Sequence, residues 1–270
     1  LPACVASKVA STCTVGALAS CTATLDGCVT GTTGGAPGFA APTVIHVVGD
    51  GPVALVAGQL DTDPAPEILV GSVSEAGWVD FVSKQSWYIG ANSITSAGFS
   101  AVDLVTGELL PDAAGPEMAL LSPKAAGKAD LLVLGTSGFA VFSPTTVSSN
   151  LAAVALAAAD VDGDGDLDLL TTGATTAWYE RQDAAGTSWS AHPIPGVSGG
   201  LALATGDVDG DGDVDVVVRT ASDVVLLRQG VAGAWAAPAS LLGAAADQMA
   251  LVDWDGDGAT DVLLLVPGGS

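Results

Sequence analysis

An acidic pattern of nine residues recurs three times in the second half of the chain, and it constrains the fold more strongly than any other feature. Each copy has Asp at positions 1, 3, 5 and 9 and Gly at position 6. The copies begin at Asp160, Asp207 and Asp253, so their starts lie 47 and 46 residues apart. A period of this length is typical of repeat architectures, and it predicts one β-propeller blade per period.

The spacing of the carboxylates predicts a metal site in each copy. Asp residues at alternate positions converge if the chain curls around one point, and the Gly at position 6 permits the sharp turn that this curl needs. A flexible shell of oxygen ligands favours Ca²⁺ over Mg²⁺, which requires a tight octahedron. A turn without metal is the alternative, but four neighbouring carboxylates would then repel one another strongly.

We therefore predict about three Ca²⁺ ions, bound by the carboxylates at positions 1, 3, 5 and 9 and by the backbone carbonyl at position 7. The candidate ligands are Asp160, Asp162, Asp164, Asp166 and Asp168 in the first loop, Asp207, Asp209, Asp211, Asp213 and Asp215 in the second, and Asp253, Asp255, Asp257, Ala259 and Asp261 in the third. No other cofactor and no catalytic residue is predicted.

The sequences that follow the acidic loops indicate strands instead of the helices of an EF-hand. An EF-hand loop ends in Glu at position 12, whereas Thr171, Val218 and Leu264 stand there in this chain. Runs of branched apolar residues follow each loop, which is typical of buried strands. Two units, 153–194 and 201–242, each predict four antiparallel strands, which is the composition of a propeller blade.

Two weaker copies of the unit precede the three acidic ones. Residues 118–135 align with the Asp160 copy and keep Asp130 at position 9, but they lack the other three carboxylates. We expect no calcium there, and we expect the Lys124 ammonium to supply part of the missing positive charge. The earliest copy retains Asp61 and Asp63 but has a shortened loop without an acid at position 5.

The last unit stops after its second strand, and its missing part is predicted at the other end of the chain. Residues 38–45 resemble residues 234–241, a predicted fourth strand. We expect Phe39–Val48 to complete the last blade, because closure removes open sheet edges. The predicted fold is an all-β propeller of about five four-stranded blades over residues 38–270, with residues 77–115 long enough to hold a sixth.

The charge of the chain excludes several classes of function. Thirty Asp and Glu residues oppose seven Lys and Arg residues, which gives a formal net charge of −23. A nucleic-acid partner is not expected, because no basic patch is present to neutralise phosphates. No apolar stretch approaches the roughly 20 residues of a membrane span, so none is predicted.

The four cysteines all fall near the N-terminus. Zinc sites with four thiolates usually use close Cys-x-x-Cys pairs, which are absent here. Two disulfides in an exported protein are therefore predicted, and the three possible pairings stay open. The cysteines are Cys4, Cys13, Cys21 and Cys28. We interpret residues 1–37 as a disulfide-rich extension that ends in a Gly- and Thr-rich linker.

With these motifs the chain resembles the FG-GAP/VCBS repeat family, the calcium-loop propellers best known from integrin α-subunit heads. The resemblance covers residues 39–270 and is specific in the three acidic loops. It implies Ca²⁺ between the first and second strands of a blade, and secretion or surface display. The two early units depart from the family pattern, and about five blades would depart from the seven of integrin heads.

The resemblance does not fix an activity, because one fold hosts many functions. We expect a non-enzymatic binding, adhesion or scaffold module whose partner is an extracellular protein or glycan, or a further copy of the chain. A carbohydrate-binding lectin is one alternative. A propeller-type polysaccharide lyase or other extracellular enzyme is another, but a lyase needs a base, and the chain has few Lys, Arg, His and Tyr residues.

The aromatic residues and histidines are interpreted mainly as structural. Trp189 and Trp235 precede the next acidic loop by the same distance along the chain, and this shared register favours core packing. Trp254 occupies position 2 of the third loop, where we expect its side chain to point outward. Neither His46 nor His192 lies in a recognisable nucleophile context.

Overall fold

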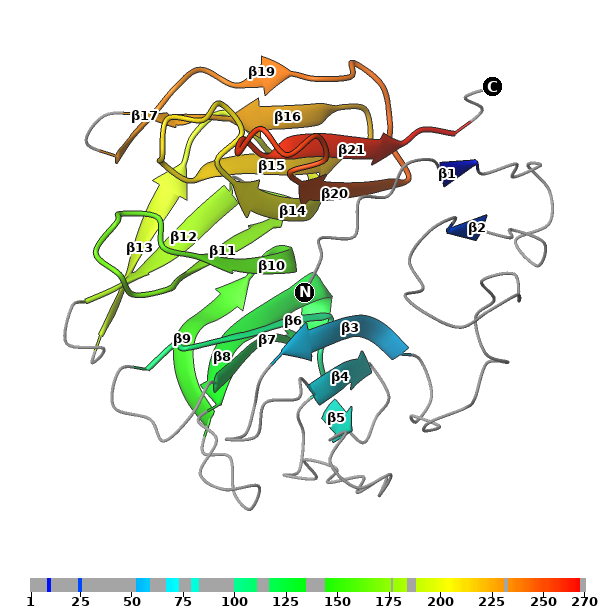
Figure 1. Cartoon of the computed structure of the whole chain (residues 1–270). Helices are drawn as coiled ribbons and strands as arrows, with labels where there is room; N and C mark the ends of the chain where they lie inside the picture. The colour runs from blue at the N-terminus through cyan, green and yellow to red at the C-terminus, as the bar shows by residue number, and fades with distance from the viewer. Residues whose placement is uncertain are drawn as a thin grey trace. The chain divides into compact units, whose positions relative to one another are not determined.

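A computed structural model of the chain describes the residues considered below (Figure 1). These are residues 9–10, 24–25, 52–58, 67–72, 79–82, 100–110, 117–134, 144–175, 177–183, 188–230 and 233–267. The four cysteines, the predicted boundary at residue 37, the predicted closing strand Phe39–Val48, His46, Asp61 and Asp63 lie outside these residues. The chain divides into two compact units, residues 1–45 with 268–270 and residues 46–267.

In the first unit, β1 (Val9–Ala10) pairs antiparallel with β2 (Thr24–Leu25). In the second unit, five antiparallel sheets follow one another in chain order, here called sheets 1 to 5. Sheet 1 contains β3 (Pro52–Gly58), β4 (Glu67–Ser72) and β5 (Val79–Val82). Sheet 2 contains β6 (Asp103–Gly107), β7 (Glu117–Lys124), β8 (Lys128–Leu134) and β9 (Pro144–Leu151).

Sheets 3 and 4 also have four strands each, and sheet 5 has two. Sheet 3 contains β10 (Ala153–Ala159), β11 (Asp168–Gly173), β12 (Ala177–Gln182) and β13 (Trp189–Ile194). Sheet 4 contains β14 (Gly200–Gly206), β15 (Asp215–Thr220), β16 (Val224–Leu227) and β19 (Ala239–Ser240), and sheet 5 contains β20 (Gln248–Val252) and β21 (Asp261–Leu265). A short pair, β17 (Gln229–Gly230) and β18 (Ala234–Trp235), extends from sheet 4.

The predicted all-β fold with four-stranded antiparallel sheets is confirmed. The described residues contain no α-helix, only a 3₁₀ turn at Ala125–Gly127. None of them forms a helix with the length and hydrophobicity that a membrane span requires. The second strands β11 and β15 are almost wholly buried, which explains why their sequences are continuous apolar and Thr-rich runs instead of alternating ones.

Strand register is the same wherever an acidic loop joins the first and second strands of a sheet. Ala159 pairs with Asp168, Gly206 with Asp215, and Val252 with Asp261. The carboxylate at position 9 therefore lies opposite the last residue of the first strand in each sheet.

Sheet 2 corrects the predicted alignment of residues 118–135. Those residues form the β7–β8 hairpin, but β7 also pairs with β6, so the hairpin joins the second and third strands of its sheet. Gly107 pairs with Glu117 as Ala159 pairs with Asp168. Glu117 is therefore the counterpart of the position 9 aspartates. The sequence misled because the β7–β8 hairpin has an apolar strand, a turn and another apolar strand, as the hairpins of the acidic loops do.

Lys124 and Asp130 form an ion pair, so the Lys124 ammonium does supply positive charge to this carboxylate. The pair lies on the β7–β8 hairpin, however, and not at the position of an acidic loop.

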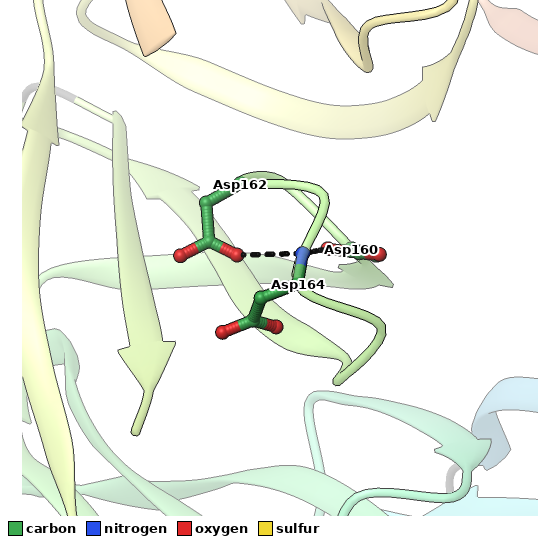
Figure 2. A group of neighbouring side chains, drawn as sticks. All are labelled: Asp160, Asp162 and Asp164. Atoms are coloured by element: carbon green, nitrogen blue, oxygen red, sulfur yellow. Dashed lines mark hydrogen bonds between the residues drawn. The ribbon is translucent and has the colours of Figure 1, made fainter. Parts of the chain in front are cut away.

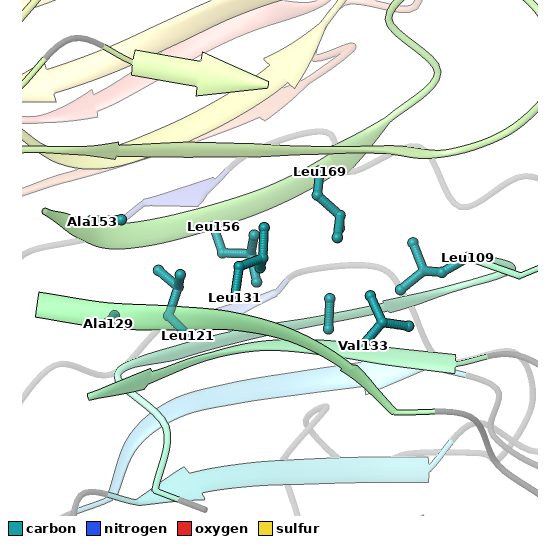
Figure 3. Packing of buried hydrophobic residues seen from close by; sticks show 9 residues of the cluster. Leu109, Leu121, Ala129, Leu131, Val133, Ala153, Leu156 and Leu169 are labelled. Atoms are coloured by element: carbon teal, nitrogen blue, oxygen red, sulfur yellow. The ribbon is translucent and has the colours of Figure 1, made fainter. Parts of the chain in front are cut away.

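Successive sheets pack through apolar clusters. The first strands of neighbouring sheets contact each other in chain order, β3 with β6, β6 with β10, β10 with β14, and β14 with β20. Figure 3 shows the cluster between sheets 2 and 3, where Leu121 and Leu131 meet Leu156 and Leu169. All four side chains are buried. Similar clusters lie between the other neighbouring sheets, so each sheet is stabilised chiefly by burial against the next.

Apolar side chains are exposed at both ends of this series. The residue three places before the end of each first strand packs against the preceding sheet: Leu104, Leu156, Leu203 and Met249. Its counterpart in sheet 1, Leu55, is 71% exposed. At the other end, four apolar residues of sheet 5 and its loop are exposed: Val252, Trp254, Leu263 and Leu265. Both terminal faces therefore have the composition of an interface.

Candidate metal-binding loops

Each acidic loop joins the first strand of a sheet to the second, in sheets 3, 4 and 5. Glycines at positions 4 and 6 have positive φ in all three loops, for example 73° at Gly163 and 97° at Gly165. Side chains other than Gly rarely adopt this conformation. A Cβ atom at Gly163 or Gly165 would meet nothing within 4 Å, so backbone conformation and not crowding explains both glycines of the first loop.

The aspartate at position 1 shapes each loop by accepting backbone hydrogen bonds. Asp160 Oδ1 accepts from the N–H of Gly163 at 2.8 Å and Asp164 at 3.1 Å, and its Oδ2 accepts from Gly165 at 2.9 Å. Asp207 accepts the same three bonds in the second loop, and Asp253 accepts two of them in the third. The chain therefore curls around this carboxylate, as the spacing predicted.

Three carboxylates converge in each loop. Figure 2 shows Asp160, Asp162 and Asp164 around the first turn. The converging groups are Asp160, Asp162 and Asp164; Asp207, Asp209 and Asp215; and Asp253, Asp255 and Asp261. Within each group, one ligand oxygen per residue lies within 4.8 Å of the others. Each group offers only hard oxygen ligands, which suits a divalent cation of the Ca²⁺ or Mg²⁺ type.

The remaining predicted ligands lie near these groups without joining them. The aspartate at position 5 joins the converging group only in the first loop. In all three loops its side chain accepts the backbone N–H of position 7: Asp211 from Asp213 and Asp257 from Ala259 at 2.9 Å, and Asp164 from Asp166 at 3.1 Å. The amide group at position 7 is thus turned into the loop in all three copies.

The aspartate at position 9 is buried in the first and second loops, where it fixes the loop to the sheet. Asp168 is 2% exposed; its Oδ2 accepts the Val161 N–H at 3.1 Å and its Oδ1 the Gln182 N–H at 2.9 Å. Burial raises the pKa of Asp168 to about 6; the two amide bonds oppose this shift, while the charges of Asp162 and Asp164 add to it. This carboxylate therefore joins the loop, the second strand and the third strand.

Asp215 repeats this arrangement in sheet 4. It is 0% exposed, and it accepts the N–H of Val208 at 3.1 Å and of Gln229 at 2.9 Å. Burial raises its pKa as well. In sheet 5, Asp261 accepts the N–H of Trp254 at 2.9 Å.

Two arginines that the sequence analysis did not single out contact the loops. Arg181, on β12, pairs through Nε with Asp162, and its Nη2 lies 3.9 Å from Asp164 Oδ2. Arg228 Nε lies 3.4 Å from Asp209 Oδ2. The sequence does contain a signal that could have identified these arginines. Each arginine is followed by a glutamine and lies at the same distance after the position 9 aspartate of its loop.

The other residues considered from the sequence have structural surroundings. Trp189 and Trp235 are partly buried against the clusters between sheets, as predicted. Trp254 is 63% exposed, which agrees with an outward side chain. His192 stacks on Tyr179 with ring centroids 5.0 Å apart, and its Nε2 lies 3.0 Å from Ser190 Oγ.

The comparisons with known proteins identify the repeat. The model of the FG-GAP-like repeat matches residues 160–218 and 207–264, and each match spans two acidic loops. Residues 160–264 therefore match the FG-GAP-like repeat, which supports the resemblance stated from the sequence over this part of the chain. No curated protein sequence matches the chain.

Two solved structures share the fold at low sequence identity. A lectin of Agrocybe aegerita that recognises non-reducing terminal N-acetylglucosamine aligns with a TM-score of 0.53 at 16% identity, over 77% of this chain. An auxiliary nutrient binding protein of Bacteroides thetaiotaomicron aligns with a TM-score of 0.52 at 13% identity, over 79% of this chain. The chain spans 60% and 52% of the length of these two proteins.

The buried position 9 carboxylate should matter even without metal. Asp215→Asn turns an amide N–H₂ group toward a backbone N–H, so one buried bond is lost. We expect the free energy of unfolding in chelator to fall by about 1–3 kcal/mol. The control Asp213→Asn replaces an exposed side chain of the same loop and should change the free energy of unfolding by less than about 0.5 kcal/mol. Urea titration measures both, and equal losses would contradict the structural role of Asp215.

Glu117 should give sheet 2 a pH-dependent stability. Its Oε2 accepts the N–H of Leu109 at 2.7 Å and of Leu110 at 3.0 Å, while Oε1 is buried without a hydrogen-bond partner in the described structure. Burial raises its pKa above the ordinary 4.5; the amide bonds oppose this, and the charge of Glu108 adds to it. The folded protein thus holds this proton more tightly than the unfolded chain. The contribution of Glu117 is complete below pH 4.5 and is lost as pH rises through the folded pKa.

Glu117→Gln keeps one acceptor oxygen and removes the charge. Relative to the wild type, we expect the variant to gain stability as pH rises from about 4 to about 8. Urea titrations at several pH values give this difference, and comparison with the wild type cancels the contributions of the other acidic groups. A difference that stays constant with pH, or that moves against the variant, would contradict the assignment.

Proposed function

We propose that this chain is a secreted or cell-surface calcium-binding β-propeller that acts as an interaction, adhesion or scaffold module and not as an enzyme. The observation that carries the proposal is the recurrence of one convergent carboxylate group at the same place in three successive sheets. These loops lie within matched FG-GAP-like repeats.

The donor set of each loop fits calcium. Only carboxylate and carbonyl oxygens are offered, and Ca²⁺ accepts six to eight such ligands in flexible geometry. The converging side chains at positions 1 and 3, with position 5 or position 9, would hold the ion. A bound Ca²⁺ supplies positive charge that offsets the mutual repulsion of these carboxylates. The chain itself supplies the preformed curl, through the hydrogen bonds accepted at position 1.

The binding role is supported by the fold. Two proteins of similar fold are a lectin and a nutrient binding protein, so a glycan or an extracellular protein is the proposed partner, with self-assembly as a third possibility. A lectin would use aromatic faces that stack on sugars, and Trp254, which is 63% exposed, would supply one if ring closure leaves it uncovered. A glycan array on the calcium-loaded protein tests this: saturable glycan binding that Trp254→Ala removes would favour the lectin over the scaffold.

We also propose that the five sheets are blades of a closed propeller. The exposed Leu55 of sheet 1 and Leu263 of sheet 5 stand at positions that pack between sheets elsewhere in the series, as Leu156 and Val217 do. Among the residues that the structure describes, sheet 5 has two strands, and Phe39–Val48 is the segment proposed to complete it. Closure would cover the terminal apolar surface and the open edge of β21.

Calcium should stabilise the fold through the acidic loops. At free calcium about ten times Kd, each occupied site adds ~1.4 kcal/mol by mass action, so chelation should lower the melting temperature. Asp209→Ala should reduce the calcium-dependent part of the shift. Lys124→Ala should leave that part unchanged, because Lys124 pairs with Asp130 away from the acidic loops. Differential scanning calorimetry with calcium or chelator measures each shift, and identical curves for the wild type would refute the calcium proposal.

Closure should depend on the segment before β3. Deleting residues 1–36 should leave a folded, monomeric propeller, whereas deleting residues 1–49 should cause aggregation, because the apolar end of sheet 5 stays uncovered. Size-exclusion chromatography and melting curves compare the two truncated proteins. If the longer deletion remains monomeric with an unchanged melting temperature, the ring closes in another way.

A further inference from the structure

We propose that Arg181 and Arg228 are built-in competitors for the cation, which weaken binding at the first and second acidic loops. The inference rests on the proposed calcium-binding function and adds a regulatory element to it. Arginines contact the acidic groups at the same place in two successive sheets. Each follows the position 9 aspartate of its own loop at an identical spacing, Asp168 before Arg181 and Asp215 before Arg228. The contact therefore belongs to the repeat and is not an isolated surface pair.

The contacts involve the side chains that would hold the ion. Arg181 pairs with Asp162 and lies 3.9 Å from Asp164, two of the three converging carboxylates of the first loop. Arg228 contacts one converging carboxylate of the second loop, Asp209, at 3.4 Å. In both loops the guanidinium binds the position 3 aspartate, so a cation at the group and the arginine draw on the same negative charge.

The arginine contacts differ in degree between the two loops. Two converging carboxylates are contacted in the first loop and one in the second. Each contact should lower the affinity for calcium, so the effect should be larger in the first loop.

The physical basis is repulsion between like charges together with loss of a shared ligand. A divalent ion and a guanidinium on the same carboxylate repel each other, and the arginine must turn toward water before the ion gains the full charge of the loop. Arg181 is 47% exposed, so this movement is possible without unfolding. Partly exposed ion pairs are weak, which limits the effect to about two- to fivefold in affinity. Such a factor adjusts the calcium concentration at which a loop fills and does not prevent binding.

The alternative is that Arg181 positions Asp162 and so assists binding. The two roles predict changes of opposite sign in calcium affinity when Arg181 is removed. Removing a competitor raises the affinity for calcium and lowers the stability of the metal-free protein, because the carboxylates lose their counter-charge. Removing a positioning residue lowers both the affinity for calcium and the stability of the metal-free protein. The change in melting temperature between chelator and calcium therefore separates them, since only a competitor makes that difference larger when it is removed.

Isothermal titration with Ca²⁺ tests the proposal on the full chain. The measurement uses a background with Asp209→Asn and Asp255→Asn, in which only the first loop retains all its carboxylates. In this background Arg181→Gln should lower Kd about two- to fivefold, whereas Arg181→Lys, which keeps the charge, should stay near the parent value. Lys128→Gln is the matched control: it removes the same charge at an exposed position on the β7–β8 hairpin and should leave Kd unchanged.

The outcomes distinguish this inference from the proposed function. If the wild type binds calcium but Arg181→Gln leaves Kd unchanged or raises it, the competitor role is overturned and the calcium site stands. If Lys128→Gln lowers Kd as much as Arg181→Gln, net charge and not the contact is responsible, which also overturns the inference. If the wild type shows no calcium binding, both proposals fail together.

Discussion

A buried carboxylate at the start of the second strand is the contact on which sheets 3 and 4 depend. Asp168 accepts one amide from its acidic loop and one from Gln182 on the third strand, and Asp215 accepts one from its loop and one from Gln229 at the start of β17, all at 2.9–3.1 Å. A buried carboxylate is costly unless its lone pairs are satisfied. The conformation of the loop and the register of the strands are therefore coupled, because neither can change without leaving this charge unpaired. Glu117 has the same place in sheet 2, where the loop has lost the acidic pattern.

The loops also depend on the sheet that follows. Val161, at position 2 of the first loop, is buried in the cluster between sheets 3 and 4, and its carbonyl accepts a hydrogen bond from Gln229 Nε2 at 2.7 Å. Trp254 has the same position in the last loop and is exposed. The first and second loops are thus part of interfaces between sheets, so an ion bound in either would stabilise the packing of two sheets and not only one turn.

The acidity of the chain has a local explanation in these loops. Five aspartates in each of the first two loops and four in the third contribute much of the net charge of −23. Backbone amides and two arginines already offset part of this charge in the protein alone. The proposed calcium ions would offset the remaining charge of these loops.

The sequence by itself determined the elements whose signals are local. The Asp and Gly positions of the loops, the strands on either side of Asp168 and Asp215, and the four-stranded units of sheets 3 and 4 follow from turn chemistry and apolar runs over short distances. Only the tertiary structure decided the rest. It placed Glu117 opposite Gly107, brought Arg181 to Asp162, and exposed Leu55 while burying its counterpart Leu156. These outcomes depend on strand pairing and on neighbouring sheets, which join residues far apart in the chain, and no local pattern specifies them.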